Sequence, residues 1–198
     1  MGTEEWLKKP GTVGKPWPIS EIAIFDEEQN RLGPNQIGTV YMAMSSGDFE
    51  YHKDKSKTQS NRIGRFFTVG DVGYLDEDGY LFLSDRKTDM IISGGANIYP
   101  AEIESVLLEH PKVVDVAVFG IPNDDWGEEV KAVVEPIDDE AGGPELEAEL
   151  LAWCAPRLAK FKTPKSIDFT HDMPRDPNGK LYKRKLRDPY WEGRDRAI

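Results

Sequence analysis

Residues 85–104 read DRKTDMIISGGANIYPAEIE, and this stretch separates two different patterns in the chain. The apolar run at 89–93 predicts a strand that ends at a Gly-Gly pair. Pro100 then predicts the first turn of a helix, because the N–H that proline lacks would have no partner there. Apolar side chains follow it at helical spacing and predict one buried face. We therefore place a domain boundary at Asp85-Arg86.

Before this boundary the pattern is that of short strands. Residues 21–25 are apolar and β-branched, and residues 38–44 alternate between two faces. Residues 66–86 form two strand-like runs around the turn DEDG, which predicts a hairpin. Residues 1–18 show no periodicity and are interpreted as a connector. Residues 1–85 are therefore predicted to form a small β-barrel-like subdomain.

The DEDG turn also bears a faint likeness to a calcium loop. Asp76 and Asp78 precede Gly79, but the closing Glu and the regular alternation of ligands are missing. We interpret the segment as a plain turn and predict no metal site.

After the boundary, strand and helix patterns alternate. Residues 113–121 are almost continuously apolar and predict a buried strand, residues 128–137 (EEVKAVVEPI) predict another, and residues 166–169 predict a short third strand. A second helix is marked by Leu146, Leu150 and Trp153. Residues 86–198 are therefore predicted to form a compact α+β domain, with a three-stranded sheet and flanking helices.

Composition excludes several classes of protein. The 198 residues carry a net charge of −11, which argues against a general nucleic-acid partner. No apolar run is long enough for a transmembrane segment, and no signal-peptide pattern is present. A single cysteine and three scattered histidines form no recognisable metal motif. We expect a reduced, cytoplasmic protein.

One basic segment stands out against this acidic background. Residues 155–187 contain ten basic and three acidic side chains, and Lys180 directly follows a Pro-Asn-Gly turn. The segment is either a solvated tail or a turn that presents Lys180 to an anionic ligand.

Three ordered motifs carry a resemblance that decides between these interpretations. FFTVGD at 66–71, the stretch at 85–104 and PNGK at 177–180 closely resemble the adenylate-forming superfamily and, within it, the acyl-CoA synthetases of fatty or aryl acids. Such enzymes convert a carboxylic acid and ATP to an acyl-adenylate, and then transfer the acyl group to coenzyme A (CoA). The resemblance covers the chain from Glu5 onward and identifies it as the C-terminal portion of a longer ligase.

The resemblance implies a division of labour within the parent enzyme. Residues 1–85 would close the large AMP-binding domain, and residues 86–198 would form its mobile C-terminal domain, or lid. The missing N-terminal domain of the same protein would bind most of the ATP and its Mg²⁺. The fragment alone is therefore expected to be inactive.

The resemblance also assigns roles in nucleotide binding and in domain movement. Asp71 would accept hydrogen bonds from the ribose hydroxyls of ATP, since a carboxylate has two acceptor oxygens, and Arg86 would contact the same sugar. Val69 departs from the family, which usually has Thr there. Thr88 falls at the family's hinge, where Asp or Lys is usual, so a hinge argument based on charge is weakened.

The remaining roles concern CoA and the adenylation step. Ser93, Gly94 and Gly95 would line the tunnel for the thin pantetheine arm of CoA, because glycine permits close backbone approach. Lys180 would be the adenylation lysine and would stabilise negative charge as pyrophosphate leaves. The sequence does not decide which basic neighbours bind the phosphates of CoA; the candidates are Lys160, Lys162, Lys183 and Arg184.

Two alternatives stay open at this point. The chain could be a non-catalytic module that binds CoA or a partner protein. It could also belong to another adenylate-forming enzyme, such as a luciferase-like protein or a peptide-synthetase adenylation domain.

Overall fold

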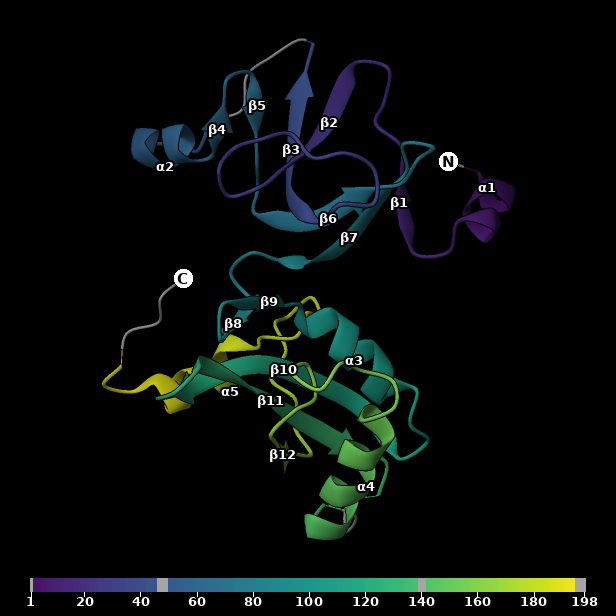
Figure 1. The fold of residues 1–198 in the computed structure, drawn as a ribbon, viewed down its shortest axis with the longest axis vertical. Helices are drawn as coiled ribbons and strands as arrows, with labels where there is room; N and C mark the ends of the chain where they lie inside the picture. Colours follow the sequence, from purple (N-terminus) through teal and green to yellow (C-terminus); the bar gives the residue numbers. More distant parts are fainter. Residues whose placement is uncertain (1, 46–49, 139–141, 195–198) are drawn as a thin grey trace. The chain divides into compact units, whose positions relative to one another are not determined.

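The computed structural model describes residues 2–45, 50–138 and 142–194, and the chain divides into two compact units, Met1–Thr88 and Asp89–Ile198. Figure 1 shows the elements of each unit along the chain. Both helices and mainly antiparallel sheets are present, so the predicted α+β class is confirmed. The division follows Thr88, shortly after the predicted boundary at Asp85-Arg86.

The first unit is built on one sheet. Its elements are α1 (Thr3–Lys8), β1 (Thr12–Gly14), β2 (Ser20–Phe25), β3 (Gly38–Met44), α2 (Lys55–Ser60), β4 (Arg62–Ile63), β5 (Phe66–Phe67), β6 (Asp71–Leu75) and β7 (Leu81–Arg86). Within the described residues the strand order is β1-β7-β6-β3-β5-β4, with β2 beside β3. No pairing there joins β1 to β4, so the sheet is open and the predicted barrel-like closure is wrong. Ile24, Val40 and Leu81 form a buried cluster of this unit.

The N-terminal segment is ordered, and its interpretation as a connector is wrong. The ammonium of Lys9 lies 2.7 Å from a carboxylate oxygen of Asp76 and 2.8 Å from one of Asp78. These two hydrogen bonds raise the pKa of Lys9, and the bond from Lys9 lowers the pKa of Asp76. The hydroxyl of Thr12 donates to the carbonyl of Leu81 at 2.7 Å, where β1 pairs with β7. The DEDG segment is thus the predicted hairpin turn, and its carboxylates bind a lysine.

The second unit contains the longest strands. Its elements are β8 (Ile91–Ser93), β9 (Ala96–Ile98), α3 (Pro100–Leu108), β10 (Val113–Asn123), β11 (Gly127–Pro136), α4 (Pro144–Cys154), β12 (Ser166–Phe169), α5 (Arg184–Arg187) and the 3₁₀ helix η1 (Asp188–Trp191). The order is β10-β11-β8-β9, with β12 parallel to β11. The crossover from β11 to β12 runs through α4, because parallel neighbours need a long connection.

The predicted three-stranded sheet of this unit is too small. The structure has five strands in the described part of the unit, because β8 and β9 form a hairpin whose residues 91 and 98 are paired. Gly94 and Gly95 both have positive φ, at 57° and 79°, which is the backbone that a two-residue hairpin turn needs. The chain after the Gly-Gly pair therefore returns as a strand before the helix begins at Pro100.

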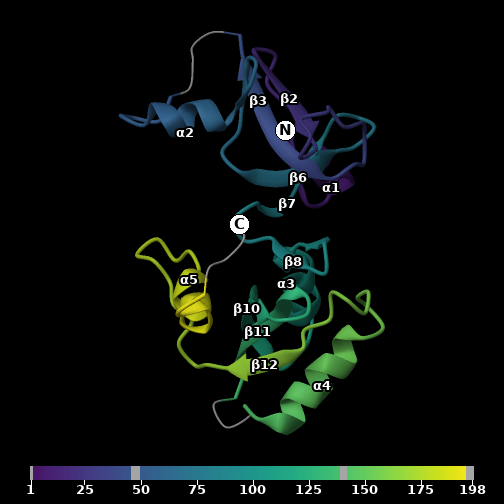
Figure 2. The same cartoon turned by 60° about the vertical axis from the view of Figure 1, so that its left-hand side comes forward.

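Helices cover both faces of this sheet, as Figure 2 shows with α3 and α4 on one side and α5 on the other. Val116 and Val118 of β10 pack toward Ile103, Leu107 and the buried residues of α4. The alternate residues Ala117 and Phe119 pack into the second cluster, with Met173, Leu181 and Leu186. Both faces of β10 are therefore buried, which explains its continuous apolar sequence.

Candidate functional site

Asp71 and Arg86 lie opposite each other at the ends of two paired strands. Asp71 begins β6, Arg86 ends β7, and the two are register partners. The Nε of Arg86 lies 3.7 Å from Oδ1 of Asp71, which is too long for a hydrogen bond. Both side chains reach solvent, with 58% of the arginine and 26% of the aspartate exposed. The structure thus brings the two predicted nucleotide-binding residues together.

The turn before Asp71 is fixed by one buried hydroxyl. The Oγ1 of Thr68 donates to the carbonyl of Val40 at 2.7 Å and accepts from the N–H of Gly70 at 3.0 Å. Gly70 has a φ of 88°, and its carbonyl accepts from the N–H of Lys87. This network directs the chain into β6 at Asp71, while the departure from the family at Val69 is exposed.

Thr88 is the last residue of the first unit. It is exposed and lies in the turn that follows β7. Its position between the units follows from the fold, while its proposed use as a hinge remains a prediction.

Ser93, Gly94 and Gly95 form the tight turn between β8 and β9. The N–H of Gly94 donates to the carbonyl of Trp126 at 2.8 Å, which fastens this turn to the turn between β10 and β11. A Cβ at position 94 would lie 2.5 Å from the ring of Trp126, whereas one at position 95 would meet nothing within 4 Å. Only glycine at 94 therefore allows the indole to lie against the turn.

This turn borders a groove of about 480 Å³. Nine residues line the groove: Ser93, Gly94, Ala96, Asn123, Trp126, Glu129, Lys160, Phe161 and Lys165. Trp126 and Phe161 are 61% and 50% exposed, so two large aromatic rings face solvent here. The sequence reasoning missed both aromatics. The sequence signal that could have identified this groove was Trp126, a tryptophan in the polar turn between two buried strands.

The four basic candidates left open by the sequence differ in their surroundings. Three pair with acids: Lys162 with Glu102 at 2.7 Å, Lys183 with Glu104 at 2.6 Å, and Arg184 with Asp188 at 3.7 Å. Lys160 lines the groove and is exposed, as is Lys165 on the same groove. Lys160 and Lys165 are therefore the two lysines that line the groove together with the aromatic rings, while Lys162, paired with Glu102, lies over Phe161 at 5.8 Å from the ring centroid.

Lys180 lies at the end of a short turn that precedes α5. Gly179 before it has a φ of 82°, a conformation that glycine adopts without strain. The side chain of Lys180 is exposed, and within the described part of the chain its ammonium forms no hydrogen bond or ion pair. Its backbone is thus held by the turn, while its ammonium is exposed and unpaired within the described residues.

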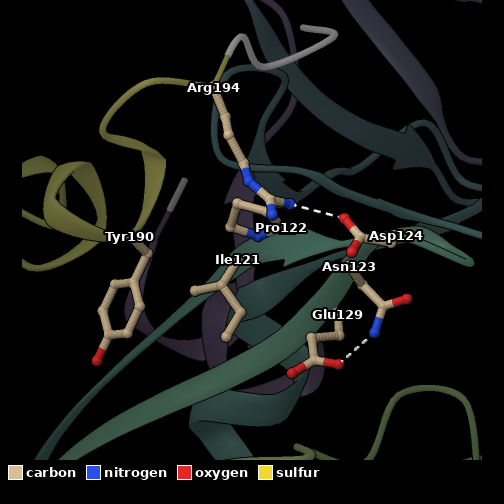
Figure 3. A pocket seen from close by; sticks show the side chains of 7 residues that line it. All are labelled: Ile121, Pro122, Asn123, Asp124, Glu129, Tyr190 and Arg194. Carbon is tan, nitrogen blue, oxygen red and sulfur yellow. Dashed lines mark hydrogen bonds and ion pairs between the residues drawn. The ribbon is translucent and has the colours of Figure 1, made fainter.

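A second hollow, of about 410 Å³, lies on the same unit and is shown in Figure 3. The guanidinium of Arg194 points toward Asp124 at 2.8 Å, and the amide of Asn123 donates to Glu129 at 2.6 Å. Its charges are thus largely paired with one another, and we assign it no ligand.

The candidate residues divide between the two units. Asp71, Arg86 and Thr88 belong to the first, whereas the turn at 93–95 and Lys180 belong to the second. Among the described residues no group of three or more His, Cys, Asp or Glu side chains is placed to hold a metal ion. Across that same part of the chain, none of the helices combines the length and apolar character required of a membrane span.

Known proteins resemble this chain along most of its length. Residues 102–180 match the family model of the AMP-binding enzyme C-terminal domain. A 2-succinylbenzoate–CoA ligase of Geobacillus kaustophilus is 40% identical over 188 residues, and a fatty acid–[acyl-carrier-protein] ligase, ScoC, of Streptomyces coeruleorubidus is 38% identical over 186. Each match covers 94% of this chain but only 37% and 35% of the respective relative.

A solved structure shows the same architecture. The o-succinylbenzoate CoA synthetase of Bacillus subtilis, in complex with its acyl-adenylate intermediate, superposes with a TM-score of 0.82 at 33% identity. The superposition covers 94% of this chain and 37% of that one. The chain therefore spans a little over a third of the length of the proteins it is similar to.

Proposed function

We propose a function from the premise that this chain belongs to the adenylate-forming enzymes through its AMP-binding C-terminal domain. The chain is the nucleotide- and CoA-handling end of an ATP-dependent acid–thiol ligase. The parent would join a carboxylic acid to ATP, with release of pyrophosphate, and then pass the acyl group to the thiol of CoA. The free ammonium of Lys180, held on a turn of this domain, is the observation that carries the proposal.

Lys180 acts in the first half-reaction. Negative charge builds on the α-phosphate as the carboxylate oxygen attacks and the bond to pyrophosphate breaks. An ammonium placed there stabilises the transition state more than the ground state. A lysine suits this role because it is a compact point charge on a flexible stem. By analogy with an oxyanion donor, its loss lowers the rate on the order of 10²–10³-fold.

Asp71 and Arg86 act on the sugar of the nucleotide. The separation of 3.7 Å leaves both carboxylate oxygens of Asp71 available as acceptors for two ribose hydroxyls. Arg86, directly opposite, supplies donors to the same ligand. Their position across one strand pair holds the two groups at a fixed spacing.

The groove beside Ser93–Gly95 acts in the second half-reaction. Its glycines permit close approach of a thin pantetheine arm, and its exposed rings, Trp126 and Phe161, offer apolar faces to a planar base. Lys160 and Lys165 on the same groove attract phosphates. These features together fit the base, phosphates and arm of CoA.

Movement between the two half-reactions takes place at Thr88. Residues 1–85 form the C-terminal subdomain of the large domain and residues 86–198 form the mobile lid, with the structural division falling just after Thr88. A few torsions in an exposed turn can absorb a domain rotation. Such a rotation brings Lys180 to the nucleotide in one state. In the other state it brings the groove at 93–95 to the nucleotide site instead.

The other participants belong to the parent enzyme as a whole. ATP and its Mg²⁺ are bound mainly by the N-terminal domain, and the described residues of this chain do not offer a cluster for the metal.

A cytoplasmic location fits the single cysteine, Cys154. This side chain is buried, and its burial raises the pKa of the thiol to about 11. Such a thiol is poorly reactive at neutral pH.

A second candidate function differs in the acyl acceptor. The ScoC relative is named as a ligase of an acyl-carrier protein rather than of CoA. Its phosphopantetheine arm, with its single phosphodiester, would use the same glycine turn, but it lacks the base that the aromatic rings of the groove could bind. The groove therefore favours CoA.

Product analysis of the intact parent enzyme tests the proposal. The enzyme is given ATP, a panel of carboxylic acids and either CoA or a holo acyl-carrier protein. We expect AMP, pyrophosphate and an acyl-CoA. Acylation of the carrier protein alone would favour the second function, and an absence of AMP formation with every acid would favour a non-catalytic binding module.

A further inference from the structure

The turn that carries Lys180 is tied to the sheet by side chains with no role so far. We propose that Arg175 and Asp176, with Asp115 on β10, are positioning residues that hold the backbone of Lys180 on the lid. This inference rests on the proposed role of Lys180 in adenylation. We call the three residues the lysine clamp.

The backbone around Lys180 is a closed hairpin. Arg175 and Leu181 form an antiparallel bridge, and the N–H of Asp176 donates to the carbonyl of Lys180 at 2.9 Å. The N–H of Tyr182 donates to the carbonyl of Pro174 at 2.7 Å. The lysine therefore stands at the end of a paired loop and not on a free tail.

Asp176 fixes the inside of this loop. Its Oδ1 accepts from the N–H of Asn178 at 2.8 Å and from the N–H of Lys180 at 2.9 Å. One carboxylate oxygen thus binds the amide of the proposed catalytic residue itself. Turns closed by an aspartate in this way substitute side-chain for backbone hydrogen bonds.

Arg175 fixes the loop to the sheet. Its guanidinium donates to the carbonyl of Gly179 at 2.6 Å and forms an ion pair with Oδ2 of Asp115. The side chain of Asp115 is only 17% exposed, and its Oδ1 accepts from the N–H of Val116 at 2.8 Å. The two terminal nitrogens of the planar guanidinium make one contact each, in a fixed geometry that the flexible ammonium of a lysine does not impose.

Apolar side chains anchor the two arms of the hairpin. Met173, before the loop, is 6% exposed, and Leu181, after it, packs against the same cluster as Phe119 of β10. The backbone of both arms and of the turn is thus held by these contacts, while the ammonium of Lys180 forms no hydrogen bond or ion pair among the residues that the structure describes. Holding a reacting group in place in this manner can account for large factors in rate.

The test compares the two half-reactions in the intact parent enzyme. In Arg175→Ala we expect acyl-adenylate formation to fall about 10- to 100-fold, because the amide of residue 180 is displaced, while thioester formation from supplied acyl-adenylate keeps the wild-type rate. Arg175→Lys keeps the positive charge but lacks the two terminal nitrogens of the guanidinium. It should therefore recover part of the lost rate of acyl-adenylate formation. Asp176→Ala, which removes the other half of the clamp, should give the same selective defect.

Matched controls separate positioning from damage to the fold. Arg157→Ala removes another exposed arginine of this unit, which donates to the carbonyl of Trp153 at 2.8 Å, and should change neither half-reaction. Arg175→Ala added to Lys180→Ala should lower adenylation no further than Lys180→Ala alone, since the clamp acts through that lysine. Equal losses in both half-reactions, or an additive double variant, would overturn the inference.

The outcomes also distinguish the clamp from the function on which it rests. If Lys180→Ala leaves adenylation unchanged, the proposed function of Lys180 is wrong, and the clamp falls with it. If Lys180→Ala is slow but Arg175→Ala and Asp176→Ala adenylate at the wild-type rate, only the clamp is wrong.

Discussion

Gly94→Ala is the substitution that tests the CoA groove most sharply. The new Cβ would lie 2.5 Å from Cε3 of Trp126, and ordinary contact begins near 3.4 Å, so the indole must withdraw by about 1 Å. Because Trp126 is 61% exposed, the ring has room to move outward without leaving a buried cavity. The main cost to folding is then the left-handed backbone at a φ of 57°, about 1–2 kcal/mol for a residue with a Cβ.

Gly95→Ala is the matched control. Its φ of 79° carries the same kind of backbone strain, but its Cβ meets nothing within 4 Å. Urea unfolding of the 198-residue chain should therefore give similar losses of about 1–2 kcal/mol for both variants. Steady-state assays of the intact parent should separate them. We expect the KM for CoA to be about tenfold higher in Gly94→Ala than in Gly95→Ala, a difference that corresponds to about 1.4 kcal/mol of binding free energy. The rate of pyrophosphate release should be unchanged. Equal KM values for the two variants would refute the proposed use of Trp126.

Two further predictions concern the second unit itself. Leu107→Ala removes a fully buried side chain of α3 and should lower the free energy of unfolding of this unit by about 2–5 kcal/mol in urea; its neighbour Leu108, 48% exposed, is the control and should cost less than about 0.5 kcal/mol as Leu108→Ala. Equal effects would contradict the assigned face of the helix. Burial and a hydrogen bond to Asp168 raise the pKa of Tyr190 from 10.0 to about 12. Since the folded pKa is the higher one, this stabilisation is present below pH 10 and is lost as the pH rises toward 12. Urea unfolding should therefore show a steeper alkaline loss of stability in the wild type than in Tyr190→Phe, and parallel pH curves would contradict this.

Periodicity predicted the elements that rest on burial. The helix that begins at Pro100 and the paired strands β10 and β11 were confirmed because an apolar face or run specifies each of them locally. The family motifs pointed to Asp71 and Arg86 independently, and the structure places them across one strand pair.

The elements that rest on distant partners were not predictable in this way. The segment at 1–18 has no period, and its order depends on Lys9 meeting carboxylates at 76 and 78. The apolar run at 89–93 predicted β8, but its partner β9 was missed because a three-residue strand carries too few residues for a pattern. Trp126 was missed for a similar reason, since its place beside Gly94 arises only when two turns meet in the fold.

The rate of acyl-adenylate formation in Lys180→Ala tests the central claim most directly. In the intact parent, pyrophosphate release with a good acid substrate and without CoA should fall on the order of 10²–10³-fold. Conversion of supplied acyl-adenylate to the thioester should keep its wild-type rate. A wild-type rate of pyrophosphate release in this variant would contradict the account, because the exposed ammonium at 180 would then have no part in splitting ATP.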